Sequence, residues 1–292
     1  MTNNQSPITN IQRQLETAYP KDEALALAWW IAEELSGLSR TQLLCGCKDT
    51  TFLANTQIII ERLLHFEPIQ YIFGHTIWNG LDLKVTPATL IPRPETAELV
   101  ERITDYQLPI TNARVLDIGT GSGCIAIALK KAHPEWQVTG IDISSEAIEV
   151  AKENAKRNNV EVDFQVADIF NLQSPIPNLQ YDIVVSNPPY ICESEKVSMN
   201  SNVLDYEPAS ALFVPDNDPL RFYRRIAELV AHTQYTIHHT PKFLFFEINE
   251  HFSDEIEDLL QSLGYTSIRI HLDIYGKPRI AEAIMRTCIS VA

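Results

Sequence analysis

From about Glu95 onward, short apolar segments alternate with helical ones, and this alternation restricts the possible folds more than any other feature of the chain. The segments that predict strands are Arg114–Ile118, Gln137–Ile141, Val162–Val166, Tyr181–Ser186 and Lys242–Ile248. Those that predict helices are Cys124–Lys131, Ser145–Arg157, Pro219–Ala231 and Ser253–Leu263, and Ser267–Leu272 with Arg279–Met285 predicts a closing hairpin. Strands separated by helices indicate an α/β fold with a mostly parallel sheet and helices on both faces. In such sheets, ligands bind beyond the carboxyl ends of the strands, where the strand order reverses.

The chain before this region has a different pattern. Apolar residues such as Ala24, Ala28 and Ile31 recur at helical spacing, and Gly37 follows as a stop signal. Further along, alternating apolar residues flank Asn79-Gly80, which predicts a β-hairpin with a tight turn. For a chain of 292 residues we therefore predict a small helical-bundle domain at residues 1–73, a hairpin linker at 74–94 and a catalytic domain at 95–292.

The charge and the cysteines restrict the function. The chain has 23 Lys and Arg against 38 Asp and Glu, a net charge of −15, which disfavours direct nucleic-acid binding because phosphate contacts need cations. No stretch is apolar enough to span a membrane and the N-terminus carries no secretion signal, so we expect a cytoplasmic protein, and a monomer. Five cysteines do not indicate a disulfide framework, and Cys45 and Cys47 are too few for a metal site, so we expect no metal.

A glycine-rich turn follows the first predicted strand of the sheet. It has the spacing Gly-x-Gly-x-Gly and consists of Gly119, Thr120, Gly121, Ser122 and Gly123, with a helix after it. Glycine allows the close approach of a ligand to the backbone, and the free N–H groups of the helix start attract an anion. Dinucleotide-binding turns have the spacing Gly-x-Gly-x-x-Gly instead. We therefore expect this turn to bind a ligand that carries a carboxylate rather than a pyrophosphate.

Acidic residues end the next two strands. Asp142 can accept both hydroxyl groups of a ribose, and Asp168 can accept a hydrogen bond from an adenine amino group while Ile169 packs on the ring. Either aspartate alone is as well explained as a helix cap or a turn residue. Together with the glycine turn, these residues predict a site for a nucleoside with an amino-acid tail. S-adenosylmethionine fits that description, and its demethylated product would be S-adenosylhomocysteine.

A second motif, Asn187-Pro188-Pro189-Tyr190, follows the fourth predicted strand. Two prolines end the strand and stiffen the loop. The side-chain oxygen of Asn187 and the backbone carbonyl of Pro188 can accept the two hydrogens of a planar NH₂ group, and the Tyr190 ring can pack on it. Positioning such a nitrogen next to an activated methyl group would supply most of the catalysis. We predict Asn187, Pro188 and Tyr190 as catalytic residues, the four motif residues as the substrate site, and Asn187 also as a cofactor contact.

These motifs resemble those of the class I methyltransferases, and nearly the whole chain resembles the HemK/PrmC family of release-factor glutamine N5-methyltransferases. The resemblance is carried by the segments Glu67–Gly74, Thr89–Thr96, Val115–Gly123, Asn187–Tyr190 and Tyr206–Pro208. It implies a Rossmann-like sheet that binds S-adenosylmethionine. It implies as substrate the glutamine of the Gly-Gly-Gln motif in class-1 peptide-chain release factors, which the helical N-terminal domain would contact. Glu95 and Thr96 would lie on the cofactor side.

Two segments depart from the family pattern, 238–242 and Glu247-Ile248-Asn249, and we expect both to lie away from the chemistry. Two other functions are weighed against this one. An adenine-N6 nucleic-acid methyltransferase also presents Asn-Pro-Pro-Tyr to a planar NH₂, but it would have to flip a base and grip phosphates, which the charge of −15 disfavours. A binding module without activity would have no need of both intact motifs.

Overall fold

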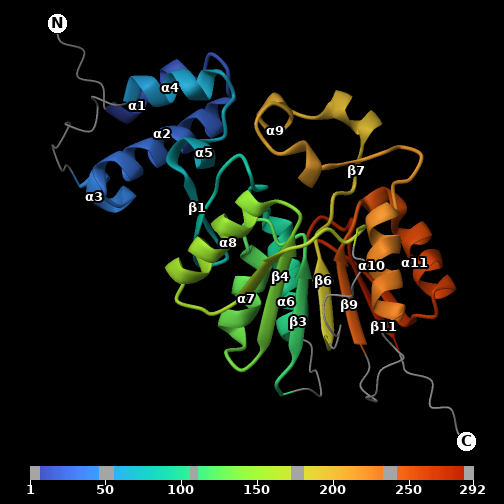
Figure 1. The fold of residues 1–292 in the computed structure, drawn as a ribbon. Coiled ribbons are helices and arrows are strands. Elements are labelled where there is room, and N and C mark those ends of the chain that lie inside the picture. The colour runs from blue at the N-terminus through green and yellow to red at the C-terminus, as the bar shows by residue number, and fades with distance from the viewer. Residues whose placement is uncertain (1–6, 46–55, 106–110, 172–180, 233–241, 286–292) are drawn as a thin grey trace, which may run out of the picture. The chain divides into compact units, whose positions relative to one another are not determined.

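The computed structural model describes residues 7–45, 56–105, 111–171, 181–232 and 242–285 (Figure 1). These residues form two compact units. The first contains the described residues of Met1–Phe73 together with Asn200–Tyr206, and the second contains those of Gly74–Met199 and Glu207–Ala292.

The first unit is helical. Its helices are α1 (Pro7–Leu15), α2 (Lys21–Ser36), α3 (Arg40–Leu44), α4 (Thr56–Leu64), α5 (Ile69–Phe73) and the short α9 (Ser201–Leu204). Helix α2 matches the helical spacing seen in the sequence, and it ends where Gly37 adopts a left-handed φ of 67°. A core that includes Ile11, Leu15 and Ile31 joins α1, α2 and α4, so the predicted helical bundle is confirmed.

The predicted hairpin is present and belongs to the second unit. Strands β1 (His75–Trp78) and β2 (Leu81–Lys84) pair around Asn79 and Gly80, whose φ values of 46° and 72° make the tight turn. Asn154 of helix α8 (Ser145–Arg157) is buried and fixes the hairpin: its Oδ1 accepts from the Lys84 N–H at 2.6 Å and its Nδ2 donates to the Lys84 carbonyl at 2.9 Å. The same Nδ2 donates to the carbonyl of Ser122, so one side chain joins the hairpin to the glycine turn.

A seven-stranded sheet forms the centre of the second unit, in the order β10-β11-β9-β6-β3-β4-β5. The five parallel strands are β3 (Arg114–Ile118), β4 (Gln137–Asp142), β5 (Asp163–Val166), β6 (Ile183–Ser186) and β9 (Lys242–Glu247). Strands β10 (Thr266–Leu272) and β11 (Pro278–Met285) add an antiparallel edge. These strands match the predicted ones to within two residues at each end.

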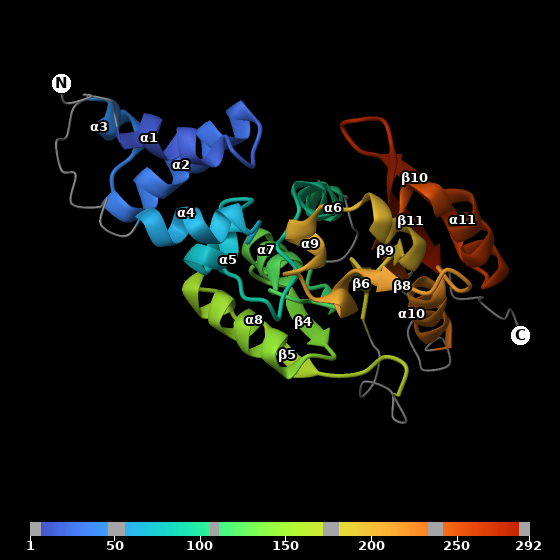
Figure 2. The ribbon, with the colours of Figure 1, turned by 90° about the horizontal axis from the view of Figure 1, so that it is seen from above.

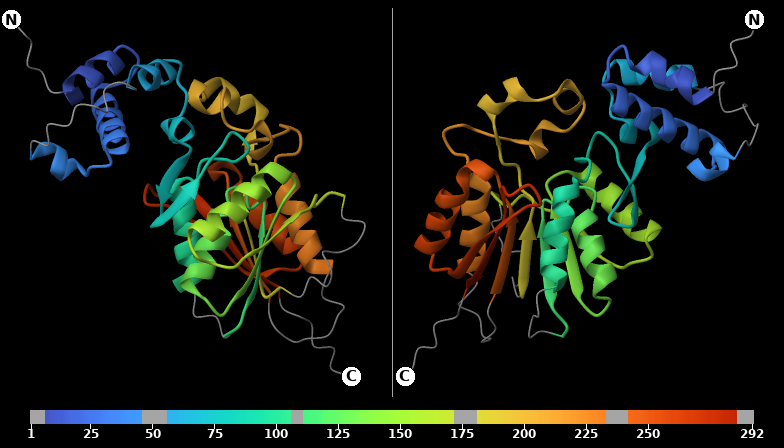
Figure 3. Two further views of the ribbon diagram at one scale, coloured as in Figure 1. Left: turned by 60° about the vertical axis from the view of Figure 1, so that its left-hand side comes forward. Right: turned by 180° about the vertical axis from the view of Figure 1, so that it is seen from behind.

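Helices cover both faces of the sheet (Figure 3). Helices α6 (Pro94–Asp105), α7 (Cys124–Ala132) and α8 share one apolar core with the hairpin, and α10 (Arg221–His232) and α11 (Ser253–Ser262) form the core on the other face. Figure 2 shows α8 and α10 on opposite sides of β4, β6 and β9. Shorter elements complete the unit: β7 (Ile191–Cys192), β8 (Phe213–Val214) and the 3-10 helices Glu193–Ser198, Ala209–Ala211 and Glu250–Phe252.

The strand order reverses between β3 and β6. The chain builds β3, β4 and β5 outward in one direction and then returns to place β6 on the other side of β3. Ile118, the last residue of β3, pairs with Ser186, the last residue of β6, and Ser186 pairs on its other side with Phe246 of β9. The glycine turn and the Asn187 motif therefore begin at neighbouring strand ends, where a ligand crevice is expected.

Candidate active site

The glycine turn connects β3 to α7 through three residues with positive φ. Gly119, Gly121 and Gly123 have φ values of 71°, 54° and 81°, which a side chain at Cβ disfavours. The backbone N–H groups of Gly119 and Thr120 both donate to the Ile141 carbonyl at 2.9 Å, which attaches the turn to β4. At Gly123 an added Cβ would also lie 3.0 Å from the Phe164 ring, so both conformation and space require glycine there.

The polar side chains of this turn point into the protein. The Thr120 hydroxyl donates to the Asp117 carboxylate at 2.6 Å, and Thr120 and Ser122 are both buried. Burial raises the pKa of Asp117 to about 7, against the opposing effect of the Thr120 hydrogen bond. The side chains of Thr120 and Ser122 therefore stabilise the turn from inside. A ligand would meet the backbone of these residues instead.

Asp142, the last residue of β4, holds the turn from the other side. One carboxylate oxygen accepts from the Gly121 N–H and the other from the Ser144 N–H, each at 2.9 Å. Ser144 in turn caps helix α8, with its hydroxyl accepting from the Ala147 N–H. The Asp142 carboxylate is half-buried, and each oxygen keeps a further lone pair for a ligand hydroxyl.

Asp168 lies in a turn just beyond β5. Its carboxylate accepts from the Phe170 N–H at 2.9 Å and from the side-chain amide of Asn171. Ile169 is buried in the core that α10 and α11 form on their face of the sheet, and its carbonyl accepts from the Arg225 guanidinium at 2.7 Å. The Asp168 carboxylate thus already has two donors from its own turn.

The Asn187 motif is held by a chain of side-chain hydrogen bonds. The Asn187 Nδ2 donates to the Thr96 hydroxyl oxygen at 3.1 Å, and that hydroxyl donates to Glu247 Oε2 at 2.7 Å. Glu247 Oε1 accepts from the Tyr190 hydroxyl at 3.0 Å. Three separate segments therefore meet at the end of β6: the first turn of α6, the motif itself and the end of β9.

Glu247 is 1% exposed, and it accepts hydrogen bonds from Tyr190 of the motif and from Thr96. Burial raises the pKa of Glu247, while the hydrogen bonds from Thr96 and Tyr190 lower it; burial also raises the pKa of the Tyr190 hydroxyl. Asn249 donates through Nδ2 to the Tyr190 carbonyl at 3.1 Å, and the Tyr223 hydroxyl donates to the Glu247 carbonyl at 3.2 Å.

These contacts correct one expectation. We expected the Glu247-Ile248-Asn249 departure to lie away from the chemistry, and this is wrong, because Glu247 and Asn249 both bond to Tyr190. Thr96 bonds to Asn187 and Glu247, and its expected position on the cofactor side stays a prediction. Residues 238–241 of the other departing segment lie outside the described residues.

Two sequence signals could have located Thr96 and Glu247. Helix α6 begins with a proline and an acidic residue, Pro94 and Glu95, and buries residues at helical spacing, namely Thr96, Leu99, Val100 and Ile103. A threonine on the apolar face of a first turn is a candidate for an internal hydrogen bond. Glu247 ends the strongly apolar β9, and a buried carboxylate must have partners.

Another buried carboxylate, Glu207, organises the segment that leads into α6. Glu207 accepts from the Arg93 guanidinium at 2.7 Å and from the Ile91 N–H at 3.1 Å. The Arg93 carbonyl accepts from the Trp78 indole N–H at 2.7 Å. These bonds hold Arg93 in place, and Arg93 begins the Arg-Pro-Glu-Thr segment. They therefore also help to position Thr96, three residues further along.

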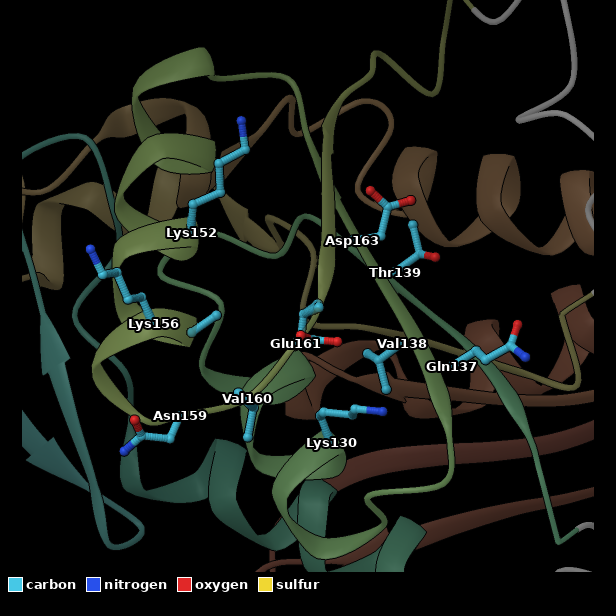
Figure 4. Close-up of a pocket in the computed structure, with 12 residues that line it drawn as sticks. Lys130, Gln137, Val138, Thr139, Lys152, Lys156, Asn159, Val160, Glu161 and Asp163 are labelled. Carbon is cyan, nitrogen blue, oxygen red and sulfur yellow. The ribbon is translucent and has the colours of Figure 1, made fainter.

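A groove of about 960 Å³ lies away from both motifs, between α7, α8 and the outer strands β4 and β5 (Figure 4). It is lined by both signs of charge, with Lys130, Lys152 and Lys156 on the helices, Glu161 just before β5 and Asp163 at its start. Lys130 already donates to the carbonyls of Pro134 and Trp136. The groove contains no motif residue, and its charges do not favour one ligand class.

Two further features concern the described residues only. No three of their His, Cys, Asp or Glu side chains come together as a metal site would need; Cys45 is exposed, and Cys47 lies outside the described ranges. No helix among them has both the length and the apolar character that crossing a membrane requires.

Comparison with known proteins identifies the family. Residues 111–267 match a methyltransferase domain and residues 8–74 match the PrmC N-terminal domain. The release factor glutamine methyltransferase of Bacteroides thetaiotaomicron is 44% identical over 277 residues, which cover 94% of this chain and 97% of that protein. The chain belongs to the release factor glutamine methyltransferase family. A second member, from Flavobacterium psychrophilum, is 39% identical over 284 residues, covering 95% of this chain and 98% of its own.

A solved structure confirms the fold class of this family member. The hMettl16 catalytic domain, crystallised with the MAT2A 3'UTR hairpin 6, superposes with a TM-score of 0.55 over 73% of this chain and 78% of that one. At 17% identity the likeness concerns the fold alone. The resemblance seen in the sequence is thus confirmed for both the family and the Rossmann-like methyltransferase sheet.

Proposed function

We propose that this methyltransferase transfers the methyl group of S-adenosylmethionine to the side-chain amide nitrogen of the glutamine in the Gly-Gly-Gln motif of class-1 release factors. The observation that carries the proposal is the pairing of Ile118 with Ser186, which puts the glycine turn and the Asn187 motif at adjacent strand ends. The family membership of the chain supports the choice of substrate.

The residues around the glycine turn fit S-adenosylmethionine. The left-handed glycines leave backbone at the surface of the turn, where N–H groups at the start of α7 favour a carboxylate. Asp142 offers lone pairs to the ribose hydroxyls. The Ile169 side chain packs in the core and would offer the adenine only the 7% of its surface that is exposed. Bound there, S-adenosylmethionine supplies a methyl group already activated as a sulfonium.

The Asn187 motif fits a primary amide. An amide nitrogen is a weak nucleophile because its lone pair is delocalised, so its two hydrogens need acceptors that hold it in one orientation. The Asn187 side-chain oxygen and the Pro188 carbonyl would accept them, and the Tyr190 ring would pack on the flat amide. These residues contribute by placing the nitrogen in line with the methyl group. Methyl transfer would form the N–C bond as the C–S bond of the donor breaks, which leaves S-adenosylhomocysteine, and the nitrogen would give up one proton to water.

Methylation of a purified release factor tests this function. The full chain is incubated with isotope-labelled S-adenosylmethionine and release factor, and the digested product is analysed by mass spectrometry. We expect one labelled methyl group on the Gly-Gly-Gln glutamine, and none when that glutamine is replaced by alanine. Parallel reactions with RNA and DNA provide the contrast, because label on adenine would favour the adenine-N6 alternative.

We also propose that the helical unit contacts the release factor. Ile58 on α4 is 63% exposed while its neighbours Ile59 and Ile60 are buried, so it is an apolar side chain available to a partner. Ile58→Asp should lower kcat/KM for intact release factor and leave that for a short Gly-Gly-Gln peptide unchanged. Ile274→Asp, which adds the same charge at a 79% exposed site in the other unit, is the control. Equal loss with both substrates would contradict the contact.

A further inference from the structure

A side-chain amide can be held in either of two orientations, which place its oxygen and its nitrogen in exchanged positions. The two ends are close in size and opposite in hydrogen bonding, because the oxygen accepts and the NH₂ donates. Packing alone therefore does not select the orientation of Asn187. Its hydrogen-bond partner must do so, and that partner is Thr96, at 3.1 Å.

The polarity of the Thr96 hydroxyl is set by Glu247. A hydroxyl has one proton to donate, and both oxygens of Glu247 act as acceptors, one for Thr96 and the other for Tyr190. The 2.7 Å contact between Thr96 Oγ1 and Glu247 Oε2 therefore takes the threonine proton. What Thr96 presents to Asn187 is a lone pair, and only the NH₂ end of the amide can bond to it.

Glu247 is itself held in place. Its other oxygen accepts from the Tyr190 hydroxyl at 3.0 Å, and the carboxylate is 1% exposed, so neither oxygen can turn toward solvent. The glutamate thus ties together the two ends of the Asn187–Tyr190 motif. Because Glu247 is a fixed acceptor at the end of this series of hydrogen bonds, each hydroxyl or amide before it must donate toward the glutamate.

We propose that Glu247 and Thr96 are positioning residues that fix the Asn187 side chain with its amide oxygen toward the substrate nitrogen. The proposal rests on the proposed function, because a substrate NH₂ group needs an acceptor. In the reversed orientation, Asn187 would turn its own NH₂ toward the NH₂ of the substrate. Two donors would then face each other, and the nitrogen would lose its alignment with the methyl group.

Three single variants and one double variant of the full chain test this role, with turnover on release factor as the readout. Thr96→Val keeps the shape and removes the hydroxyl, and it should lower kcat by about 10- to 100-fold. The dissociation constant of Thr96→Val for S-adenosylmethionine should stay within about two-fold, because the Thr96 hydroxyl bonds to Asn187 and Glu247. Thr96→Ser keeps the hydroxyl and should retain kcat within about three-fold.

Glu247→Gln tests the direction of the chain. Its amide can offer an NH₂ to Thr96, which would let the threonine donate to Asn187 and reverse the amide, so kcat should fall by about 10-fold. Because both residues act through one chain, the double variant Thr96→Val with Glu247→Gln should lose no more than Thr96→Val alone.

The outcomes separate this inference from the proposed function. If wild-type enzyme does not methylate the Gly-Gly-Gln glutamine, the proposed function fails and the inference fails with it. If wild-type enzyme does so and Thr96→Val turns over equally fast, only the inference fails. Loss in Thr96→Ser as large as in Thr96→Val, or cofactor affinity lost in step with kcat, would make the role structural. Should Thr96→Val fail to fold, the near-isosteric Glu247→Gln and Thr96→Ser carry the same comparison.

Discussion

The two halves of the active site are built in different ways. On the glycine side, Asp142 accepts from Gly121, 21 residues away, and Asp168 accepts from its own turn. On the Asn187 side, the bonds join side chains 91 and 151 residues apart, from Asn187 to Thr96 and from Thr96 to Glu247. The glycine side is thus shaped mainly by backbone and short-range contacts, and the Asn187 side by a few long-range side-chain bonds. A single substitution should therefore do more damage to the second.

The largest effect is expected at Asn187. Asn187→Ala removes the acceptor that holds the substrate amide, and loss of one such preorganised group costs on the order of 100- to 1,000-fold in turnover. Affinity for S-adenosylmethionine, measured by calorimetry, should change by only a few-fold, since the glycine turn is intact. A variant with near-normal kcat would show that the Asn187 oxygen does not hold the substrate.

This difference also explains what could be read from the sequence. The glycine turn, Asp142 and Asp168 follow strands whose apolar pattern is visible, so their shared edge follows from parallel topology alone. Asn187 is found the same way, through β6. The predicted strands, the helical bundle and the Asn79-Gly80 hairpin were all recoverable because each depends on local periodicity or turn chemistry.

The hydrogen bonds that join Asn187, Thr96 and Glu247 were not recoverable in this way. Nothing in the local sequence of Thr96 indicates that it meets Glu247, because the two come together only when α6 packs against β9. The helix α6 itself could have been found from its start signals, but its contact could not. Long-range side-chain pairs depend on the tertiary fold, and sequence patterns predict elements rather than such pairs.

The second prediction concerns Asp142, the charged acceptor on the glycine side. Asp142→Ala removes a charged acceptor for the ribose and releases the Gly121 N–H, so it should weaken S-adenosylmethionine binding by about 1–3 kcal/mol. Calorimetry with the cofactor alone measures this. For Asp142→Ala, turnover at saturating cofactor should fall much less than for Asn187→Ala. Unchanged affinity would contradict the ribose assignment.

The third prediction concerns the packing beneath the glycine turn. An added Cβ at Gly140 would lie 2.6 Å from the Phe164 ring and 2.8 Å from the Thr120 hydroxyl, so Gly140→Ala must displace one or both of these side chains, and Thr120 belongs to the turn. We expect a loss of about 1–3 kcal/mol in unfolding free energy, measured from urea midpoints, together with weaker cofactor binding. Gly37→Ala is the control: it has φ +67° and open space around it, so it should destabilise the protein without changing cofactor affinity.

The smallest effect on cofactor affinity is expected at Asp168. It tests whether the glycine side of the site includes this carboxylate. The Asp168 carboxylate already accepts hydrogen bonds from the Phe170 N–H and the Asn171 amide, so part of its hydrogen-bonding capacity stabilises its own turn. If it also accepts from the adenine amino group, Asp168→Asn should weaken binding of S-adenosylmethionine by about 0.5–1.5 kcal/mol. The loss should be smaller for an analogue in which the adenine amino group is replaced by hydrogen, because no bond remains to be lost. Equal losses for the two ligands would mean that Asp168 serves only the turn, and the nucleoside would then be recognised by Asp142 and the glycine backbone without it.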